Sequence, residues 1–300
     1  MNSIAIRRCS AKWRGIEEYI KGIRHSSCDV RVTESDGQAT PLTKDAVRSG
    51  CEVVVAVGGD GTVNEVVNGL FESGVTFDQN LVLVIIPLGS GCDLARSLSI
   101  PSKISEAIKA VESNSMRRID VGMVDFVNLG GERERRYFVN IADLGGGGLV
   151  VQKANRAPRI LGQRPNYLWG MLSVAFSYRT RMMDVSIDGS EPLRLAAKNL
   201  IIANGRYFGR GFLAAPQAKM DDGLFDIVSV GDFGTIEALW HLPKLYRGTH
   251  LGLEKVSYFR GRKVEASSDE EVLLEMDGEL VGTLPATFGI IPDAINVVTR

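Results

Sequence analysis

The stretch CEVVVAVGGDGT, residues 51–62, is the strongest indication of fold class in this chain. After Glu52 the run is apolar on both faces, which is typical of a strand buried inside a parallel sheet. A glycine-rich turn follows, and the residues after it keep the apolar spacing of a helix. Thr62 and Glu65 have capping-box spacing at the start of that helix. The order strand, glycine turn, helix is therefore predicted here.

The same order recurs directly downstream. Residues 81–86, LVLVII, form a second apolar run, PLGSG at 87–91 is a second glycine turn, and another helix opens at Asp93. Ser90 and Asp93 have capping-box spacing, so this turn is either a simple helix cap or the opposite wall of a phosphate site. Upstream, Thr40 and Pro41 predict the start of a helix that ends before Gly50. Consecutive units of this kind predict an open, mainly parallel α/β sheet.

The pattern changes near Asn114. Short runs of alternating apolar and polar residues, separated by Asp-Gly, Asn-Gly and glycine-rich turns, predict antiparallel β structure. One exception is the aromatic and basic segment 156–181, which contains no acidic residue. This segment is predicted to be a helix that packs on the sheet, lies at a lipid surface, or does both with opposite faces. We therefore expect a first domain at 1–118 and a second at 119–288.

Composition and charge limit the class of protein. Three hundred residues agree with two domains, and 35 basic against 36 acidic residues exclude broad attraction of a polyanion such as nucleic acid. The four cysteines form no C-x-x-C pair, which favours a reducing compartment and no structural zinc. The longest strictly apolar runs are far shorter than a membrane span. We expect a cytoplasmic protein that is at most peripheral to the inner face of the membrane.

The first glycine turn has the chemistry of a phosphate site. Gly58, Gly59 and Gly61 allow the main chain to approach phosphate closely, and the following helix start presents N–H groups and the Thr62 hydroxyl. Asp60 would repel phosphate unless a cation lies between them, which indicates Mg²⁺. The alternative is that Asp60 makes only a hydrogen bond within the turn. The second turn, with Gly89, would supply the other wall of the same site.

Five motifs in order resemble the signatures of the diacylglycerol kinase and sphingosine kinase lipid-kinase family, in its bacterial branch. They are VAVGGDGTVNE (55–65), PLGSGCDLAR (87–96), ANGRYFG (203–209), APQAKMDDGL (215–224) and DGE (277–279). The Gly-Gly-Asp-Gly sequence alone is weak because NAD kinases share it, but the last two motifs are specific to the lipid-kinase branch. The resemblance implies an N-terminal α/β nucleotide domain of the NAD kinase/diacylglycerol kinase type. It also implies an all-β sandwich C-terminal domain, with residues 289–300 returning to the first domain.

The resemblance also implies where the cofactors bind. ATP would be held by the two turns and the end of an earlier strand, at Thr33, Gly58, Gly59, Asp60, Gly61, Thr62, Asn64, Glu65, Gly89 and Ser90. Mg²⁺ would be held by the Asp222 carboxylate with the main-chain carbonyls of Lys219 and Leu224, a reasonable donor set for a hard cation. From the residues alone, Asp221-Asp222-Gly223 reads as a hairpin turn.

Transfer of the γ-phosphoryl group to a hydroxyl requires a group that accepts the hydroxyl proton. The resemblance assigns catalytic roles to Glu279, Asp60 and Asp277, and both Glu279 and Asp60 are candidate bases. The resemblance favours Glu279 as the base and Asp60 as the organiser of metal or phosphate, and the base is the one that comes within hydrogen-bond reach of the acceptor hydroxyl. The alternative for Glu279 is a solvated strand end.

Three features depart from the family pattern. The first 13 residues lack the nucleotide-contacting turn usual in the family, and Cys92 stands where an asparagine is common. Residues 144–149 contain four consecutive glycines and lack the aromatic-acidic pair of many members, so substrate contacts there are not transferred.

We expect an ATP- and Mg²⁺-dependent lipid kinase that phosphorylates a hydroxyl of diacylglycerol or a related membrane lipid. Peripheral contact with the membrane follows from such a substrate, and no nucleic acid is expected as a partner. The alternatives are a kinase of a soluble acceptor such as NAD, and a nucleotide-binding regulator that has lost catalysis. The sequence does not identify the lipid or the oligomeric state.

Overall fold

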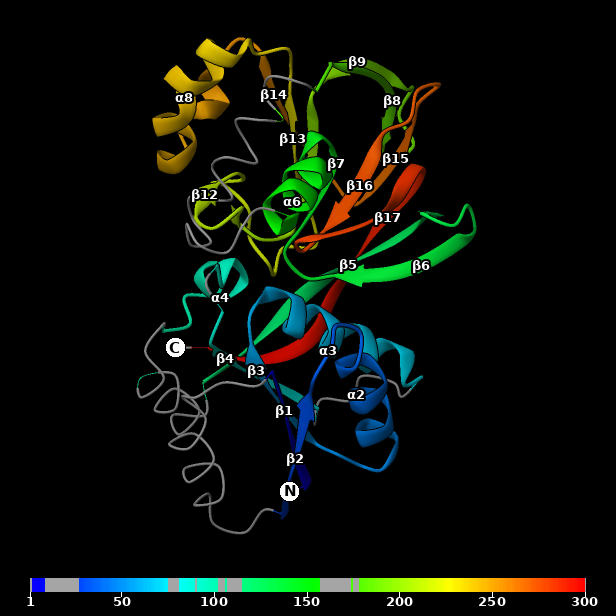
Figure 1. Cartoon of the computed structure of the whole chain (residues 1–300), viewed down its shortest axis with the longest axis vertical. Helices are drawn as coiled ribbons and strands as arrows, with labels where there is room; N and C mark the ends of the chain where they lie inside the picture. Colours follow the sequence, from blue (N-terminus) through cyan, green and yellow to red (C-terminus); the bar gives the residue numbers. More distant parts are fainter. Residues whose placement is uncertain are drawn as a thin grey trace. The chain divides into compact units, whose positions relative to one another are not determined.

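The computed structural model describes residues 2–8, 27–74, 81–89, 91–101, 106, 115–156, 174 and 178–299. The chain forms two compact units: Met1–Asp120 with Pro292–Arg300, and Val121–Ile291. Both boundaries lie inside strands, β5 (Met116–Asn128) and β17 (Glu279–Val298), rather than in linkers (Figure 1). The boundaries expected at 118/119 and 288/289 fall within the same two strands.

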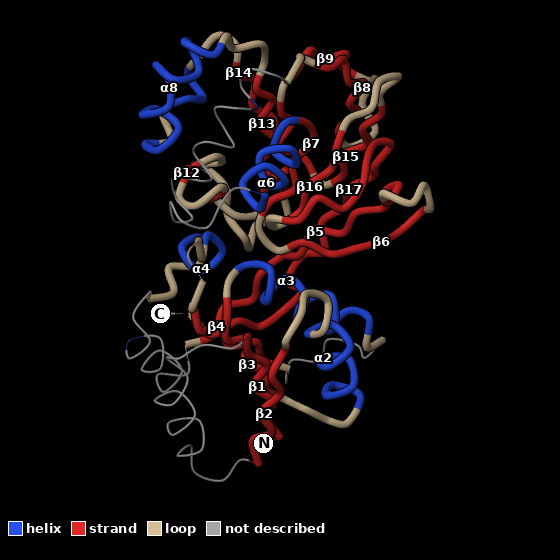
Figure 2. Tube along the Cα trace, in the orientation of Figure 1, coloured by secondary structure: helices blue, strands red, loops and turns tan. Residues whose placement is uncertain are grey.

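The first unit is built on a parallel sheet. Its strands are β1 (Asn2–Arg8), β2 (Ser27–Thr33), β3 (Val53–Gly58) and β4 (Val82–Pro87), in the order β4-β3-β1-β2 (Figure 2). The last part of β17 extends this sheet by pairing in parallel with β4, with Asn296 opposite Val82. The predicted open, parallel α/β architecture is confirmed.

Helices α2 (Ala39–Arg48), α3 (Asp60–Glu72) and α4 (Asp93–Ser97) complete the described part of this unit. The first two of these helices approach each other closely. A Cβ on Gly69 would lie only 2.4 Å from the carbonyl oxygen of Thr40, so any side chain there would push α3 away from α2. The apolar core of the sheet includes Val55, Val57, Val84, Ile86 and Val298.

Two predicted helix starts are wrong, for the same physical reason. Helix α3 begins at Asp60 with Gly59 as its N-cap, so Thr62 and Glu65 form no capping box. The Glu65 carboxylate instead accepts the Ala39 N–H at 2.9 Å, and α2 therefore begins before Thr40. A carboxylate that is distant in sequence satisfies the free amide that a local cap was expected to satisfy. Ser90, the expected cap of the next helix, lies outside the described residues.

The second unit is antiparallel β structure with two longer helices. Its main path runs β14-β13-β10-β7-β16-β17, and β17 also pairs with β15 and β5. The strands not yet given are β6 (Arg133–Phe138), β7 (Ile141–Gly145), β8 (Arg181–Ile187), β9 (Leu193–Ala197), β10 (Asn199–Ala203), β11 (Tyr207–Phe208), β12 (Phe212–Leu213), β13 (Phe225–Val230), β14 (Val256–Gly261), β15 (Lys263–Ser267) and β16 (Leu273–Met276). The helices are α6 (Gly146–Arg156), α8 (Thr235–Arg247) and the short η2 (His250–Gly252).

An aromatic cluster marks the core of this unit. Phe138 stacks on Phe225 with ring centroids 5.6 Å apart, and Phe288 meets Phe138 edge-on at 6.3 Å. These rings belong to an apolar cluster with members from β5, β6, β13 and β17. The predicted β-sandwich class of the C-terminal domain is confirmed by this packing of strands.

Most of the basic and aromatic segment 156–181 lies outside the described residues, so its predicted helix is not described. Within the part of the chain that the structure describes, no helix combines the length and the apolar character needed to cross a bilayer.

Candidate active site

The two glycine turns of the first unit are in contact. Strands β3 and β4 pair up to Gly58 and Pro87, and the Leu88 N–H donates to the Gly58 carbonyl at 2.9 Å. A Cβ on Gly89 would lie 2.5 Å from the Cα of Gly59, so the two main chains touch at a point where Gly89 cannot carry a side chain. The sequence predicted that these two turns form one site, and their contact agrees with that.

Asp60 links the first glycine turn to the start of α4 by hydrogen bonds. Its carboxylate accepts the main-chain N–H groups of Asp93 and Leu94, each at 3.1 Å. Asp60 therefore begins α3 and at the same time caps the start of α4. These two bonds account for an acidic residue in a glycine turn without any cation, and they reach further along the chain than the turn hydrogen bond considered from the sequence.

Cys92 is the N-cap residue of α4 and has a left-handed backbone, with φ 51° and ψ 46°. Its thiol donates to the Gly89 carbonyl at 3.2 Å. Burial, with the nearby Asp60 carboxylate as the next cause, raises the pKa of this thiol to about 11. The group is therefore a neutral, weak donor. Asparagine adopts the left-handed region more readily than cysteine, which gives a backbone reason for the asparagine usual at this position in the family.

The predicted nucleotide residues gather at one edge of the parallel sheet. Strand β2 ends at Thr33 and β3 at Gly58, and the carboxyl edge of such a sheet is where ligands bind in open α/β folds. The first turn of α3 adds N–H groups that have no partner within the helix. The residues at this edge are Thr33, Gly58, Gly59, Gly61, Thr62 and Gly89.

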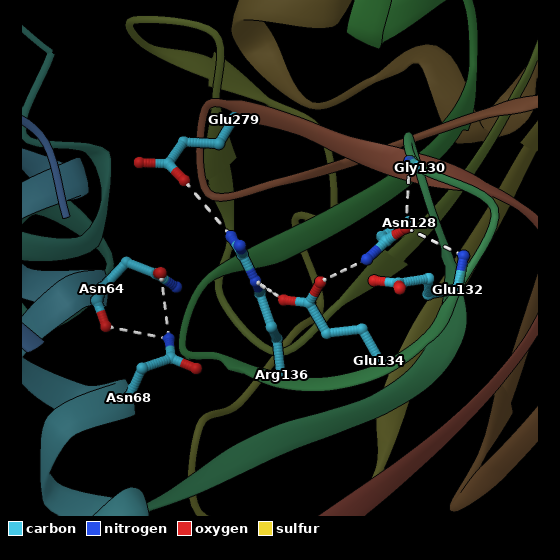
Figure 3. A network of polar contacts seen from close by, with 8 residues as sticks. All are labelled: Asn64, Asn68, Asn128, Gly130, Glu132, Glu134, Arg136 and Glu279. Carbon is cyan, nitrogen blue, oxygen red and sulfur yellow. Dashed lines mark hydrogen bonds and ion pairs between the residues drawn. The ribbon is translucent and has the colours of Figure 1, made fainter.

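Two predicted nucleotide residues are engaged elsewhere. The side-chain oxygen of Asn64 accepts from the Asn68 amide at 3.0 Å, as Figure 3 shows, and the Glu65 carboxylate caps α2. Their described contacts therefore organise the helices behind the turn.

The second unit contributes the Asp277-Gly278-Glu279 turn between β16 and β17. Asp277 is buried with φ 46°, and its carboxylate accepts the N–H groups of Val139, Asn140 and Ile141 at 2.9, 3.0 and 2.9 Å. Both carboxylate oxygens are thus used to hold the segment between β6 and β7. The described contacts give Asp277 a positioning role.

Glu279 is the more accessible carboxylate of this turn, with 40% of its side chain exposed. Arg136 lies 3.6 Å from one of its oxygens and also pairs with Glu134 at 2.5 Å. Glu134 in turn accepts from the Asn128 amide at 3.1 Å, which completes the chain of contacts in Figure 3. The sequence analysis missed Arg136, because the pairing of β5 with β6 places it and no motif contains it.

Among the predicted magnesium residues, Asp222 forms an ion pair with Arg260. One Asp222 oxygen accepts the Leu224 N–H at 3.2 Å, and the other pairs with the Arg260 guanidinium. Arg260 Nε also lies 3.5 Å from buried Asp226, whose pKa is raised mainly by burial. Among the described residues no group of three metal-ligating side chains occurs. The described contacts of Asp222 are with Leu224 and Arg260, and the magnesium site expected at Lys219, Asp222 and Leu224, with two main-chain carbonyls, stays a prediction.

A buried carboxyl pair was missed by sequence reasoning. Asp143 on β7 is directly opposite Glu275 on β16, and both side chains are fully buried. Asp143 accepts the Gly147 N–H at 3.0 Å and the Asn199 amide at 2.8 Å, while its other oxygen has no partner among the described residues. Burial raises the pKa of Asp143 to about 7 and raises that of Glu275 well above its usual value, with Asp143 as the next cause.

The carboxyl pair explains part of the run of four glycines. A Cβ on Gly147 would lie 2.0 Å from the Asp143 carboxylate, and one on Gly148 would lie 2.8 Å from Cδ1 of Leu280 on β17. The start of α6 can therefore cover these two strands only without side chains. The pattern Asp-x-Gly-x-Gly was the available signal, but only the strand register shows which partner the aspartate has.

An apolar cavity of about 230 Å³ lies within the second unit, beneath α8. Leu242 and Leu245 of α8 line it, together with Phe212, Phe233 and Val230. Asn199 and Tyr178 are among its few polar lining residues. Such a lining offers dispersion contacts and few hydrogen bonds, so the cavity suits an apolar group.

Each of the two units has a counterpart among known protein families. The diacylglycerol kinase catalytic domain matches residues 7–124, and the YegS C-terminal NAD kinase beta sandwich-like domain matches residues 141–299. The crystal structure of a diacylglycerol kinase from Bacillus anthracis has a TM-score of 0.72 at 19% identity, covering 100% of this chain and 96% of that one. That likeness supports the fold.

Two curated relatives extend over most of the chain. The diacylglycerol kinase of Bacillus subtilis is 31% identical over 271 residues, which are 89% of this chain and 84% of that protein. A YegS-like lipid kinase of Chromohalobacter salexigens is 33% identical over 277 residues, 90% of this chain and 84% of that protein. The chain therefore belongs to the diacylglycerol kinase-like lipid kinase family, and it is a kinase with a hydroxyl acceptor.

Proposed function

We propose that this protein transfers the γ-phosphoryl group of Mg²⁺-bound ATP to a hydroxyl of diacylglycerol or a closely related membrane lipid. The observation that supports this most directly is the contact of two glycine turns at the carboxyl edge of a parallel sheet. The relatives named as diacylglycerol kinase or lipid kinase support the acceptor class.

The first unit binds the nucleotide. The N–H groups in the first turn of α3, the Thr62 hydroxyl and the glycine main chain receive the phosphates. Mg²⁺ bound with ATP supplies neutralisation of the charge that builds up on the transferred phosphoryl group. Asp60 is a positioning residue here, since its carboxylate sets the distance between the two turns through Asp93 and Leu94.

The second unit supplies the proton acceptor. The acceptor oxygen forms a bond to the γ-phosphorus, the bond from that phosphorus to the ADP oxygen breaks, and the hydroxyl proton goes to the Glu279 carboxylate. Asp277 positions Glu279 by fixing the turn that precedes it. Arg136, 3.6 Å from one oxygen of Glu279, orients this carboxylate.

The cavity beneath α8 receives an acyl chain of the acceptor. Its volume of about 230 Å³ is below the roughly 300–1,000 Å³ of sites that enclose drug-sized ligands, so it suits part of one chain. The protein therefore works at a membrane surface, because the acyl chains of such an acceptor lie within the bilayer.

The direct test is incubation of the protein with labelled ATP, Mg²⁺ and mixed micelles of candidate lipids. Labelled phosphatidic acid from diacylglycerol is the expected product. No labelled lipid across a broad panel, together with labelling of NAD, would establish a soluble acceptor instead. Binding of Mg²⁺-ATP without turnover on any acceptor would establish a regulator.

A further inference from the structure

Helix α8 exposes large apolar side chains to solvent. Ile236 is 84% exposed and Trp240 is 79% exposed, four positions apart on the same side of the helix. Pro243 follows on that side and is also exposed. An isolated exposed apolar residue needs no explanation, but several together on one helix face mark an interaction surface.

The opposite side of α8 lines the apolar cavity. Ala238, Leu242 and Leu245 face that space, and Leu239 both lines it and is 43% exposed. No residue of α8 is buried. One helix thickness therefore separates the cavity from the exposed apolar side chains, and Leu239 marks the rim where the two meet.

The charges of α8 favour an anionic partner. Lys244 and Arg247 are exposed in its last turn. Glu237 is the one acidic residue of the helix, and it is neutralised by Lys255 at 2.7 Å while it also accepts the Gly234 N–H at 3.2 Å. An exposed tryptophan beside basic residues is typical of a helix that lies at a membrane interface.

The size of this surface argues against a second protein chain. A 13-residue helix is about 20 Å long and its exposed side about 10 Å wide, which gives on the order of 200 Å². A stable protein interface buries about 800 Å² on each partner. A bilayer needs no matching shape and accepts shallow insertion of a few side chains.

We infer that the α8 outer face, defined as Ile236, Trp240, Pro243, Lys244 and Arg247, docks on an anionic lipid bilayer and places the cavity rim against the acyl chains. This inference rests on the proposed lipid kinase function, which it deepens by naming the surface that meets the membrane. Trp240 and Ile236 enter the interfacial region, and Lys244 and Arg247 contact the anionic headgroups.

The test is sedimentation of the full-length protein with vesicles of phosphatidylcholine alone and of phosphatidylcholine with phosphatidylglycerol. The variant Ile236→Ser/Trp240→Ser is expected to bind both vesicle types at least tenfold more weakly than the wild type. Lys244→Gln/Arg247→Gln is expected to lose about tenfold in affinity for the anionic vesicles only. Leu129→Ser, at another exposed leucine, is the matched control and keeps wild-type binding.

Kinase assays separate docking from catalysis. The ratio of activity on vesicle lipid to activity on a monomeric short-chain diacylglycerol is expected to fall in Ile236→Ser/Trp240→Ser, with an unchanged melting curve. Unchanged vesicle binding in this variant would overturn the inference, and so would a dimer that this variant dissociates. Vesicle binding that depends on α8, with no phosphorylation of any lipid by the wild type, would overturn the proposed function and leave the docking surface intact.

Discussion

Asp60 connects the chemistry of the site to its architecture, because its carboxylate holds α4 against the start of α3. Asp60→Asn keeps the shape but leaves one of the two main-chain donors, Asp93 or Leu94, facing an amide N–H group. We expect kcat to fall more than tenfold while the protein stays folded, since the turns shift relative to the phosphates.

The check on Asp60 is a comparison of kinase rates with amide hydrogen exchange. Faster exchange at Asp93 or at Leu94 should accompany the loss of kcat, and the melting temperature should fall by only a few degrees. Activity near that of the wild type with unchanged exchange would remove Asp60 from the set of positioning residues.

Asp143 gives the protein a pH-dependent stability. Its pKa is about 7 in the folded state against a usual value of 3.8, so the folded state binds the proton more tightly than the unfolded chain. The stability from this group is fully present below about pH 4 and is lost as the pH rises to about 7. The Asp143→Asn variant has no carboxyl group to titrate here and so does not lose this stability. The difference in free energy of unfolding, variant minus wild type, should therefore rise by on the order of 1–3 kcal/mol between pH 4 and pH 8.

Urea unfolding at several pH values measures this difference, with exposed Asp269→Asn as the control that should show no trend. Glu275 is opposite Asp143 across the strand pair, so the contribution of Asp143 to the raised pKa of Glu275 disappears in the variant as well. A wild-type-to-variant difference that stays constant from pH 4 to 8 would contradict the shifted titration.

At the scale of elements, the β16–β17 turn contains two carboxylates with different roles: Asp277 holds the turn in place, and Glu279 is the proposed proton acceptor. Glu279→Gln keeps the turn, because Asp277 holds it through three main-chain bonds, but removes the proton acceptor. We expect kcat to fall by about 10²–10⁴-fold with ATP affinity and melting temperature unchanged. Glu134→Gln is the matched control, since Glu134 shares Arg136 with Glu279. Equal losses in both variants would assign the effect to Arg136.

Arg260, near the end of β14, forms ion pairs with Asp222 just before β13 and with Asp226 at its start. Arg260→Gln leaves Asp222 and buried Asp226 without their cation, so we expect the unfolding free energy to fall by about 1–3 kcal/mol. Millimolar Mg²⁺ should restore part of that loss in the variant and leave the wild-type melting temperature unchanged. Arg135→Gln, which breaks only the exposed pair with Asp125, is the control. Stabilisation of the wild type by Mg²⁺ would show that the metal displaces Arg260.

Elements with a strong local pattern could be predicted from the sequence. The apolar runs of β3 and β4 and the helical spacing of α3 are such patterns, and the structure has these elements. The opening of α4 at Asp93 was also predicted, but the starts of α2 and α3 were not, because the Glu65 carboxylate binds Ala39, 26 residues away, instead of capping its own helix. No local rule selects among distant carboxylates.

The residues of the candidate site also fall into those that could be predicted from the sequence and those that could not. The glycine turns and the Asp-Gly-Glu motif carry a chemical signature in the sequence, so their residues could be named in advance. Arg136, Arg260 and the pair Asp143 and Glu275 acquire meaning only through strand register, because charged residues on alternating strands look like a solvated face until their partners are known.

At the scale of the whole molecule, the proposed reaction draws on both units. The nucleotide turns belong to Met1–Asp120, whereas Glu279 belongs to Val121–Ile291. Strands β5 and β17 each contribute to both units, so the chain passes between them without a flexible linker of its own. A substitution of Glu279 should therefore stop phosphoryl transfer while the first unit still binds ATP. A substitution in the nucleotide turns should stop transfer while the second unit still binds the lipid.

The most direct measurement is the transfer of labelled phosphate from ATP to diacylglycerol in mixed micelles with Mg²⁺, compared between the wild type and Glu279→Gln. We predict labelled phosphatidic acid with the wild type, and at least a tenfold lower rate with a variant that still binds ATP. Equal rates for the two proteins, or no labelled lipid from the wild type, would contradict the account.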